Sequence, residues 1–347
     1  MSCIKPFIFE FAGNTGNTVF TNPCIAVEGL AMFSTLMRDF SSFCSPVSFA
    51  SANAPVWNAI ISDYFTPNWI DRIDRTSGDV FEKFKEYCEM SDCTLIVAPE
   101  DDMLLYKLSK IADKHNNLGS SAESVKITSD KWVLYKRLKG KVDLPETSLR
   151  PLSVKHLIKP RTSCGGAGIK INTKNKNSNK SDCNCIYQEF IDGIDLSVSL
   201  VAGDDINVIS INKQLLKDFE YAGAIVPFRL SMKELNEIIS AAVETVSSLR
   251  IFGYCGIDIV YGDRAYVVDV NARLTTPAVT FKASYGINVG KIIINNFDGK
   301  LNLETKRCVC TKLLKTDRNV TGCEELVKYC DSKIVLEILH DKCIKVN

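Results

Sequence analysis

Two apolar segments that each carry an aspartate most strongly limit what this chain can fold into. Asp258 lies in the segment GIDIV, Asp269 opens the run DVNAR at 269–273, and Gly262-Asp263 stands between the two segments. A Gly-Asp pair between two strand-like runs favours an antiparallel hairpin. The sequence therefore predicts two paired strands whose aspartates lie close together.

Oxygen-bearing side chains share one face of this predicted hairpin. Asp269 and Asn271 are two residues apart and point to the same side, and Asp258 can lie beside them on the neighbouring strand. A buried carboxylate is costly unless it is paired or binds a cation, and such oxygen donors suit Mg²⁺ or Mn²⁺. Arg273 falls on the same face if the strand continues, where its guanidinium would handle negative charge. A solvated strand face with ordinary charges stays an open alternative at this point.

Charge and hydropathy exclude several classes of function. Lys and Arg total 42 against 41 Asp and Glu, so there is no positive field of the kind that draws a protein to nucleic acid. No apolar run reaches the ~18 residues that a membrane helix needs. We therefore expect a cytoplasmic protein with neither a nucleic-acid nor a membrane partner.

The 14 cysteines are scattered along the chain. Their closest pairs, Cys183/Cys185 and Cys308/Cys310, are C-x-C, and only three histidines are present. This spacing favours reduced structural thiols over a zinc or iron-sulfur site.

Periodicity predicts the organisation of the chain. Residues 4–11 and 94–98 read as strands and 26–40 as a helix, and acidic residues at 100–102 predict a second helix that opens at Pro99. This βα pattern favours a parallel sheet covered on both faces. Further along, helical periodicity begins at about Ser121 and is followed by the stop signal Leu144-Pro145, and 172–184 reads as a solvated hairpin or loop. Ser231 and Glu234 form a capping box before an apolar helical stripe. The segment from 301 reads as a short strand and helix.

A glycine cluster follows a strand-like run that ends in Lys159-Pro160. Gly165, Gly166 and Gly168 would let backbone N–H groups approach an anion, with Lys159 as a neighbouring point charge. The spacing fits neither a P-loop nor a dinucleotide-binding turn. A glycine-rich hairpin turn without a ligand is the alternative for this segment taken alone.

The segment from Gln188 to Asp195, QEFIDGID, predicts a nucleotide contact. Its extended start would offer backbone groups to the edge of an adenine, and Asp195 would reach ribose hydroxyls. A plain strand and turn is the alternative.

In their order and spacing, these segments resemble the ATP-grasp superfamily of carboxylate-amine ligases. The segments that carry the resemblance are Ser129-Asp130-Lys131, Lys159-Pro160, Gly165 to Gly168, QEFIDGID, Asp258 and DVNAR. The resemblance implies an α/β (α+β) chain with an ATP-grasp fold, in which an N-terminal βα preliminary domain precedes two α+β subdomains that grip ATP. It places the preliminary domain at 1–120, the ATP-grasp domain at 121–300 and a C-terminal capping segment at 301–347. Within the ATP-grasp domain, 121–190 would be the small subdomain with the glycine loop and 191–300 the metal-binding subdomain.

The resemblance also implies roles for single residues. Those it assigns to ATP are Lys131, Lys159, Gly165, Gly166, Gly168, Gln188, Glu189, Phe190, Ile191 and Asp195. Asp258, Asp269 and Asn271 would hold two Mg²⁺ or Mn²⁺ ions, and Arg273 and Lys159 would act on the reacting phosphoryl or acyl group. Many relatives have glutamate at the positions of Gln188 and Asp269, which leaves the number of metal ions open.

Three short segments resemble one group of these ligases more closely. They are EGLAMF at 28–33, APEDD at 98–102 and NARLTTPA at 271–278, and they resemble the tyramine-L-glutamate ligase family of methanofuran biosynthesis. That likeness implies two small-molecule substrates, L-glutamate and tyramine, with the LTTP turn near the acceptor. A ligase for another amino-acid or cofactor acceptor, a phosphotransferase without amide formation and a non-catalytic ATP-binding sensor remain alternatives, and a homo-oligomer stays open.

Overall fold

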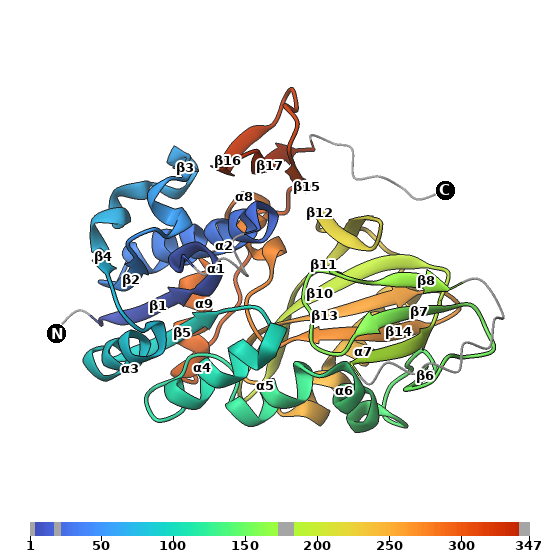
Figure 1. The fold of residues 1–347 in the computed structure, drawn as a ribbon. Helices are drawn as coiled ribbons and strands as arrows, with labels where there is room; N and C mark the ends of the chain where they lie inside the picture. Colours follow the sequence, from blue (N-terminus) through green and yellow to red (C-terminus); the bar gives the residue numbers. More distant parts are fainter. Residues whose placement is uncertain (1–3, 17–21, 173–183, 340–347) are drawn as a thin grey trace.

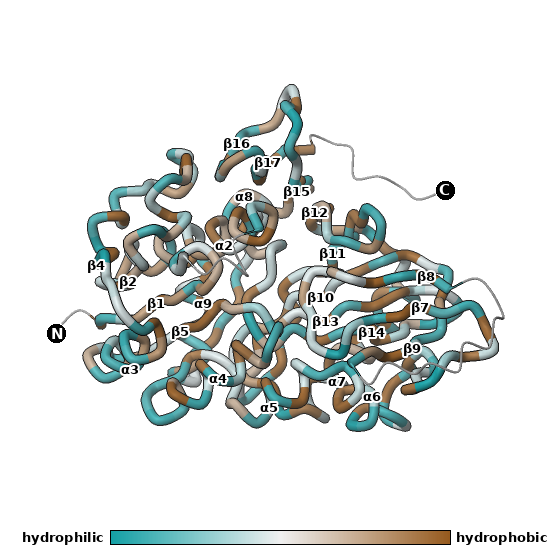
Figure 2. Tube along the Cα trace, in the orientation of Figure 1, coloured by the Kyte–Doolittle hydropathy of each residue, from teal (hydrophilic) through white to brown (hydrophobic). Residues whose placement is uncertain are grey.

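The computed structural model describes residues 4–16, 22–172 and 184–339. The tract at 172–184, for which the sequence predicts a solvated loop, lies outside the described residues except at its two ends. Figure 1 shows the N-terminal parallel strands on the left, a large antiparallel sheet on the right and the last strands at the top. In Figure 2, hydrophobic residues gather where these parts pack together, and the outer helix near residue 85 is largely hydrophilic.

The N-terminal part is built on parallel strand pairs, as the βα pattern predicts. Strand β1 (Pro6–Glu10) pairs in parallel with β5 (Cys93–Val97), and β2 (Ser48–Ser51) pairs in parallel with β4 (Ile73–Thr76). A parallel bridge between Phe7 and Val47 connects the two pairs. The helices of this part are α1 (Phe11–Asn14), α2 (Pro23–Ser41), α3 (Val80–Met90) and α4 (Leu104–Ala112), with short 3-10 turns η1 (Pro55–Trp57), η2 (Asp63–Phe65), η3 (Pro67–Arg72) and η4 (Asp101–Met103).

The predicted helix start at Pro99 is wrong. Asp101 to Met103 form the 3-10 turn, and Asp102 and Met103 have φ of 50° and 57°. Helix α4 therefore begins only at Leu104, without an acidic first turn. The Glu100 carboxylate does not contribute to the first turn of α4 and instead forms an ion pair with Arg273.

Helices α5 (Ala122–Thr128) and α6 (Lys131–Leu138) divide the helical stretch that the sequence predicts from residue 121. The Asp130 side chain caps α6 by accepting hydrogen bonds from the N–H groups of Trp132 and Val133. This cap fixes Lys131 at the first helical position. The chain then enters a four-stranded antiparallel sheet in the order β6 (Thr147–Ser148), β9 (Cys185–Glu189), β7 (His156–Pro160) and β8 (Lys170–Asn172).

A nine-stranded antiparallel sheet forms the rest of the molecule. Its order is β14 (Ala265–Asn271), β13 (Gly253–Tyr261), β10 (Ile194–Ala202), β11 (Ile206–Lys217), β12 (Glu220–Val226), β15 (Thr311–Thr316), β17 (Ser332–Ile338), β16 (Glu324–Tyr329) and β3 (Ile60–Ile61). Helix α7 (Met232–Leu249) opens with the predicted capping box of Ser231 and Glu234. It buries its apolar stripe against this sheet with Ile238, Ala242 and Val246.

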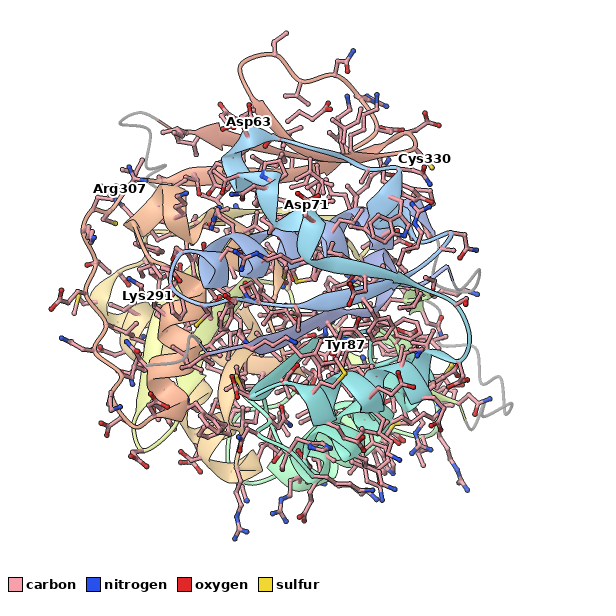
Figure 3. The ribbon with its side chains drawn as sticks, turned by 90° about the vertical axis from the view of Figure 1, so that its left-hand side faces the viewer. Asp63, Asp71, Tyr87, Lys291, Arg307 and Cys330 are labelled. Carbon is pink, nitrogen blue, oxygen red and sulfur yellow. The ribbon has the colours of Figure 1, made fainter. Side chains whose placement is uncertain are left out.

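The C-terminal segment differs from its prediction. The described residues after 301 form strands β15, β16 and β17 and no helix. β15 pairs with β12, so this segment continues the sheet rather than packing beside it. The far edge meets the N-terminal part, because Ser62 N donates to Leu326 O at 2.9 Å. Figure 3 shows Asp63 of η2 beside these last strands.

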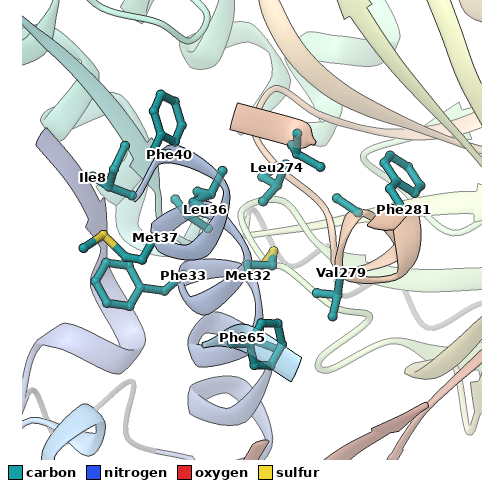
Figure 4. Close-up of a cluster of buried hydrophobic side chains, with 14 of the residues drawn as sticks. Ile8, Met32, Phe33, Leu36, Met37, Phe40, Phe65, Leu274, Val279 and Phe281 are labelled. Atoms are coloured by element: carbon teal, nitrogen blue, oxygen red, sulfur yellow. The ribbon is translucent and has the colours of Figure 1, made fainter. Parts of the chain in front are cut away.

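Helix α2 ties the N-terminal and C-terminal parts together. Its side chains Phe33, Leu36 and Phe40 are fully buried. Figure 4 shows them between Ile8 of β1 and the segment after β14 that carries Leu274, Val279 and Phe281. That segment continues into η5 (Thr276–Thr280), α8 (Phe281–Tyr285) and α9 (Val289–Phe297). This shared apolar core fixes the position of α2, which forms one wall of a cavity at the centre of the molecule.

Candidate active site

A cavity of about 650 Å³ opens where the N-terminal part, the small sheet and the large sheet meet. Its walls include the β13–β14 hairpin, the glycine loop, the end of β9 and one face of α2. Twelve of the site residues predicted from sequence line it: Lys159, Gly165, Gly166, Gln188, Glu189, Phe190, Ile191, Asp195, Asp258, Asp269, Asn271 and Arg273. Lys131 and Gly168 are not among the lining residues.

The predicted oxygen ligands meet on the β13–β14 hairpin. Asp258 stands directly opposite Asp269 in the strand register, and a bulge next to this pair increases the local twist. Asn271 Nδ2 donates to Asp258 Oδ2 at 3.2 Å, and Gln214 Nε2 donates to Asp258 Oδ1 at 2.9 Å. The hairpin therefore holds two carboxylates and an amide within one small area of the cavity wall.

The electrostatics of this hairpin fit a bound cation. Burial and, to a smaller extent, the facing Asp269 carboxylate together raise the pKa of Asp258 to about 7. Two carboxylates this close repel each other, and a divalent ion between them would relieve that repulsion. Hard oxygen donors are the ligands that Mg²⁺ and Mn²⁺ prefer. The donor set therefore fits the predicted metal, with Asp258, Asp269 and Asn271 as the residues that would hold it.

Two buried lysines approach the hairpin from the small sheet and α6. Lys131 Nζ lies 3.2 Å from Asp269 Oδ2 and donates to Ser163 O at 2.8 Å. Burial acts to lower the pKa of Lys131, but Asp269 outweighs it and the pKa is raised. For Lys159 burial dominates and lowers the pKa to about 8, with the Lys131 charge acting in the same direction. Of these two lysines, Lys159 lines the cavity, and Lys131 acts on the site through Asp269.

The glycine loop is seated against the turn between β11 and β12. Gly166 has φ of +81°, and a Cβ there would lie 2.0 Å from Phe219 O. Tyr221 N donates to Gly165 O at 3.2 Å, which fixes the neighbouring peptide. Only glycine allows the backbone to approach so closely at position 166. Gly165 and Gly166 line the cavity, so the loop backbone is accessible to a phosphate bound there.

The end of β9 forms another wall. Gln188 is buried, and its Nε2 donates to Thr147 Oγ1 at 3.3 Å. Phe190 N donates to Lys155 O at 3.0 Å, and Lys155 Nζ lies 3.7 Å from the centre of the Phe190 ring. Asp195 follows at the start of β10, where burial raises its pKa against the opposing effect of Lys159. The segment is a strand end and turn, and it faces the cavity.

Arg273 does not continue the metal-binding face as predicted. Strand β14 ends at Asn271, two residues before Arg273. The Arg273 guanidinium instead forms a bidentate ion pair with Glu100, with Nε–Oε1 and Nη2–Oε2 distances of 2.8 and 2.9 Å. Burial acts to lower the pKa of Arg273, but Glu100 outweighs it and the pKa is raised. Arg273 lines the cavity as a permanently charged group that Glu100 holds in place.

Comparison with known proteins places this geometry in a family. A family model described as an ATP-grasp domain matches residues 128–277, and a pre ATP-grasp 3 domain matches 65–125. The chain is 31% identical to a tyramine-L-glutamate ligase of Methanocaldococcus jannaschii over 296 residues, which is 83% of this chain and 87% of that one. The chain belongs to the ATP-grasp family. A tyramine-L-glutamate ligase of Methanocaldococcus fervens is 30% identical over 83% of this chain and 92% of its own length.

Solved structures confirm the predicted ATP-grasp fold. A putative ATP-grasp superfamily protein from Archaeoglobus fulgidus superposes with a TM-score of 0.80 and 38% identity, over 97% of this chain and all of that one. An L-amino acid ligase from Bacillus licheniformis has a TM-score of 0.66 and 15% identity over 92% of this chain and 81% of its own, which shows the fold alone. The chain therefore has an ATP-grasp fold, with a pre ATP-grasp domain matched in its N-terminal part.

Several cavity residues of the ATP-grasp chain escape prediction from sequence. Glu10 ends β1, and its buried carboxylate accepts from Ala12 N and Gly13 N; burial raises its pKa to about 7. Glu28 of α2 and Lys315 of β15 also line the cavity. The position of Glu10 at the carboxyl end of a parallel strand is the signal that could have found it. Glu28 lies in the quoted segment EGLAMF, but no local pattern pairs it with Lys315.

The expectations about cysteine and membranes can be compared with the described part of the ATP-grasp chain. Eight of the described cysteines are free thiols: Cys24, Cys88, Cys93, Cys164, Cys255, Cys308, Cys323 and Cys330. Within the same residues, no group of three or more His, Cys, Asp or Glu side chains is arranged to hold a metal ion. Cys183 lies outside the described ranges, so a reduced thiol at this position stays a prediction. Among the described helices, none has the length and apolar character required to span a bilayer.

Proposed function

We propose that this ATP-grasp ligase joins the side-chain carboxylate of L-glutamate to the amine of tyramine and so forms γ-glutamyltyramine in methanofuran biosynthesis. The tyramine-L-glutamate ligases of two Methanocaldococcus species, about 30% identical over most of the chain, support this choice of substrates. The observation that carries the proposal is one cavity lined by the carboxylate hairpin, Lys159, the glycine loop and Glu28 of α2. One cavity can therefore bring ATP, a carboxylate and an amine together.

The chemistry follows from the groups around the cavity. A carboxylate oxygen attacks the γ-phosphorus of ATP, giving an acyl phosphate and ADP; the neutral amine then attacks the acyl carbon, and phosphate leaves with that oxygen. Asp258, Asp269 and Asn271 would hold Mg²⁺ or Mn²⁺, and the bound ion would neutralise charge on the phosphoryl oxygens. Lys159 contributes a fixed positive charge to the same oxygens, and Arg273 steadies the reacting group. Lys131 keeps Asp269 oriented. Holding the substrate carboxylate and ATP together supplies much of the rate enhancement.

In this proposal the remaining ATP contacts follow the cavity walls. Gly165 and Gly166 would cover the phosphates, with Gly168 shaping the loop. Gln188 to Ile191 would line the adenine, and Asp195 would bind ribose. None of these roles needs a protein nucleophile.

Oxygen-18 transfer tests the reaction class. With ¹⁸O in the side-chain carboxylate of glutamate, the acyl-phosphate route delivers one labelled oxygen to each inorganic phosphate formed. Mass spectrometry of the phosphate and of the amide measures both products. Unlabelled phosphate alongside labelled amide would show that the carboxylate never attacked ATP.

Use of ATP is expected to weaken as the pH rises through about 8. The pKa of Lys159 is lowered to about 8 because the side chain is buried, so its charge is lost there and not near its ordinary value of 10.5. The KM for ATP should therefore increase above this pH in the wild type. Lys159→Arg, which stays charged throughout, should show a weaker but flatter profile. Parallel profiles for both proteins would contradict the phosphate role of Lys159.

Stabilisation by Mg²⁺ is expected to grow with pH. The folded pKa of Asp258 is raised from 3.8 to about 7, so without metal its contribution to stability is complete below pH 3.8 and is lost as the pH rises through 7. A cation that binds the ionised carboxylate offsets this loss. Melting temperatures with and without MgCl₂ at about pH 5.5 and about pH 8 measure the effect. The shift should be larger at the higher pH and absent in Asp258→Asn; an equal shift in that variant would count against the metal site.

A further inference from the structure

An ion pair joins the N-terminal and C-terminal parts inside the cavity. Lys315 Nζ of β15 lies 2.5 Å from Glu28 Oε1 of α2, although the two residues are 287 positions apart. Their side chains are 15% and 17% exposed, and both line the cavity. Thr276 Oγ1 donates to Glu28 Oε2 at 2.9 Å, which fixes the orientation of the carboxylate. Three distant segments therefore meet at one pair of opposite charges.

A polar group without a partner lies beside this pair. The Tyr221 hydroxyl is buried and has no hydrogen-bond partner among the described residues, and Tyr221 lines the same cavity. Lys315 Nζ lies 6.0 Å from the centre of its ring. Burial raises the pKa of Tyr221 well above its ordinary value, and the Glu28 and Asp258 carboxylates raise it further. Tyr221 thus lies within electrostatic reach of both the ion pair and the carboxylate hairpin.

A purely structural role, in which the ion pair only links the two parts of the chain, explains this arrangement less well. An ion pair this far from bulk water contributes little to stability compared with apolar residues of similar size, because both charges lose most of their water. A buried hydroxyl without a partner adds a further cost. Both features lie on a cavity wall, where a ligand can complete them. A fixed pair of opposite charges is complementary to a zwitterion, whose own two charges can align beside it in the opposite order.

We propose that Glu28, Lys315 and Tyr221 form the subsite for the head group of an α-amino acid. Glu28 binds the α-ammonium group, Lys315 binds the α-carboxylate, and the Tyr221 hydroxyl donates to that carboxylate. The side-chain carboxylate of the amino acid then extends toward Asp258 and the phosphates. This assignment rests on the proposed function for its reaction, but it requires only that one substrate is an α-amino acid.

Two analogues of glutamate each lack one charge of the head group, so the contribution of each charge to binding can be measured separately. Glutarate keeps both terminal carboxylates but lacks the ammonium group, and 4-aminobutyrate lacks the α-carboxylate. The wild type should bind each of them roughly 100-fold more weakly than L-glutamate, because one member of a desolvated charge pair is then left without its partner. Binding is measured by calorimetry with Mg²⁺ and a non-hydrolysable ATP analogue, so the result does not depend on turnover.

Single variants should remove these preferences selectively. Glu28→Gln should bind L-glutamate and glutarate about equally, and Lys315→Gln should bind L-glutamate and 4-aminobutyrate about equally. The double variant Glu28→Gln/Lys315→Gln removes both charges together and leaves no unpaired buried charge, so it keeps the test valid if a single variant fails to fold. Lys312→Gln is the matched control, because Lys312 lies on the same strand as Lys315 but does not line the cavity, and it pairs with Glu337 of β17 at 3.7 Å.

The outcomes separate this proposal from the proposed function. If the wild type turns over L-glutamate but the variants keep its selectivity among the three compounds, the subsite is wrong and the function stands. If the wild type does not bind L-glutamate, the standard L-amino acids are tested in the same way. An amino acid whose binding is lost in the double variant and kept in Lys312→Gln supports the subsite with another substrate. Binding of no amino acid overturns both.

Discussion

Replacing Asp258 or Asp269 with asparagine is expected to lower ADP formation at least ~1000-fold, because each change removes a negative oxygen ligand from the predicted metal site. Stability should not fall in Asp258→Asn. Burial and the facing Asp269 carboxylate raise the pKa of Asp258 to about 7, so the neutral amide relieves a repulsion in the metal-free protein. Steady-state ADP release and thermal unfolding, measured on the same preparations, check the two expectations.

Asp263→Asn is the matched control for this pair. Asp263 lies in the turn of the same hairpin, is 65% exposed and does not line the cavity. Its replacement should leave ADP formation within about twofold of the wild type, as expected for a surface change. Near-wild-type turnover in Asp258→Asn, or an equal loss in Asp263→Asn, would remove the metal-site assignment. A stable but inactive Asp258→Asn would show that the carboxylate is kept for function rather than for folding.

Gly166→Ala is expected to lower kcat/KM for ATP roughly 100-fold. An alanine at φ of +81° costs about 1–2 kcal/mol by itself. Its Cβ would also lie 2.0 Å from Phe219 O, so the loop must move away from the β11–β12 turn. Gly165→Ala is the control, because that residue also has positive φ, +61°, but its Cβ would meet nothing within 4 Å. It should lose about tenfold or less.

Steady-state kinetics in ATP compare the two glycine variants. Proteolytic nicking of the loop, with and without Mg-ATP, reports whether the loop closes over nucleotide in each of them. Nucleotide should protect the wild type and Gly165→Ala but not Gly166→Ala. Equal losses of kcat/KM in both variants would mean that backbone strain alone matters and that contact with the β11–β12 turn does not.

Local patterns predicted the carboxylate hairpin and the long helix α7 because their causes lie within short segments. The Gly262-Asp263 turn and the strand period place Asp258 opposite Asp269, and the capping box at Ser231 fixes the start of α7. The prediction of a strand, a glycine loop and a second strand end likewise rests on residues that are close to one another in sequence. Such features need no knowledge of the rest of the fold.

Contacts between distant segments could not be predicted in this way. Arg273 pairs with Glu100, 173 positions away, and that pairing accompanies the late start of α4 at Leu104. Lys315 meets Glu28 only because β15 joins β12 in the sheet. The C-terminal segment reads as strand and helix until this edge of the sheet is known. Tertiary pairing therefore decides which charges face the cavity.

The most direct measurement of the central claim is ADP release with L-glutamate and tyramine, each omitted in turn. Sustained release should require both substrates, and one molecule of amide should appear for each ADP. Release that continues at the same rate without tyramine, or without glutamate, would contradict ATP-dependent ligation of this pair.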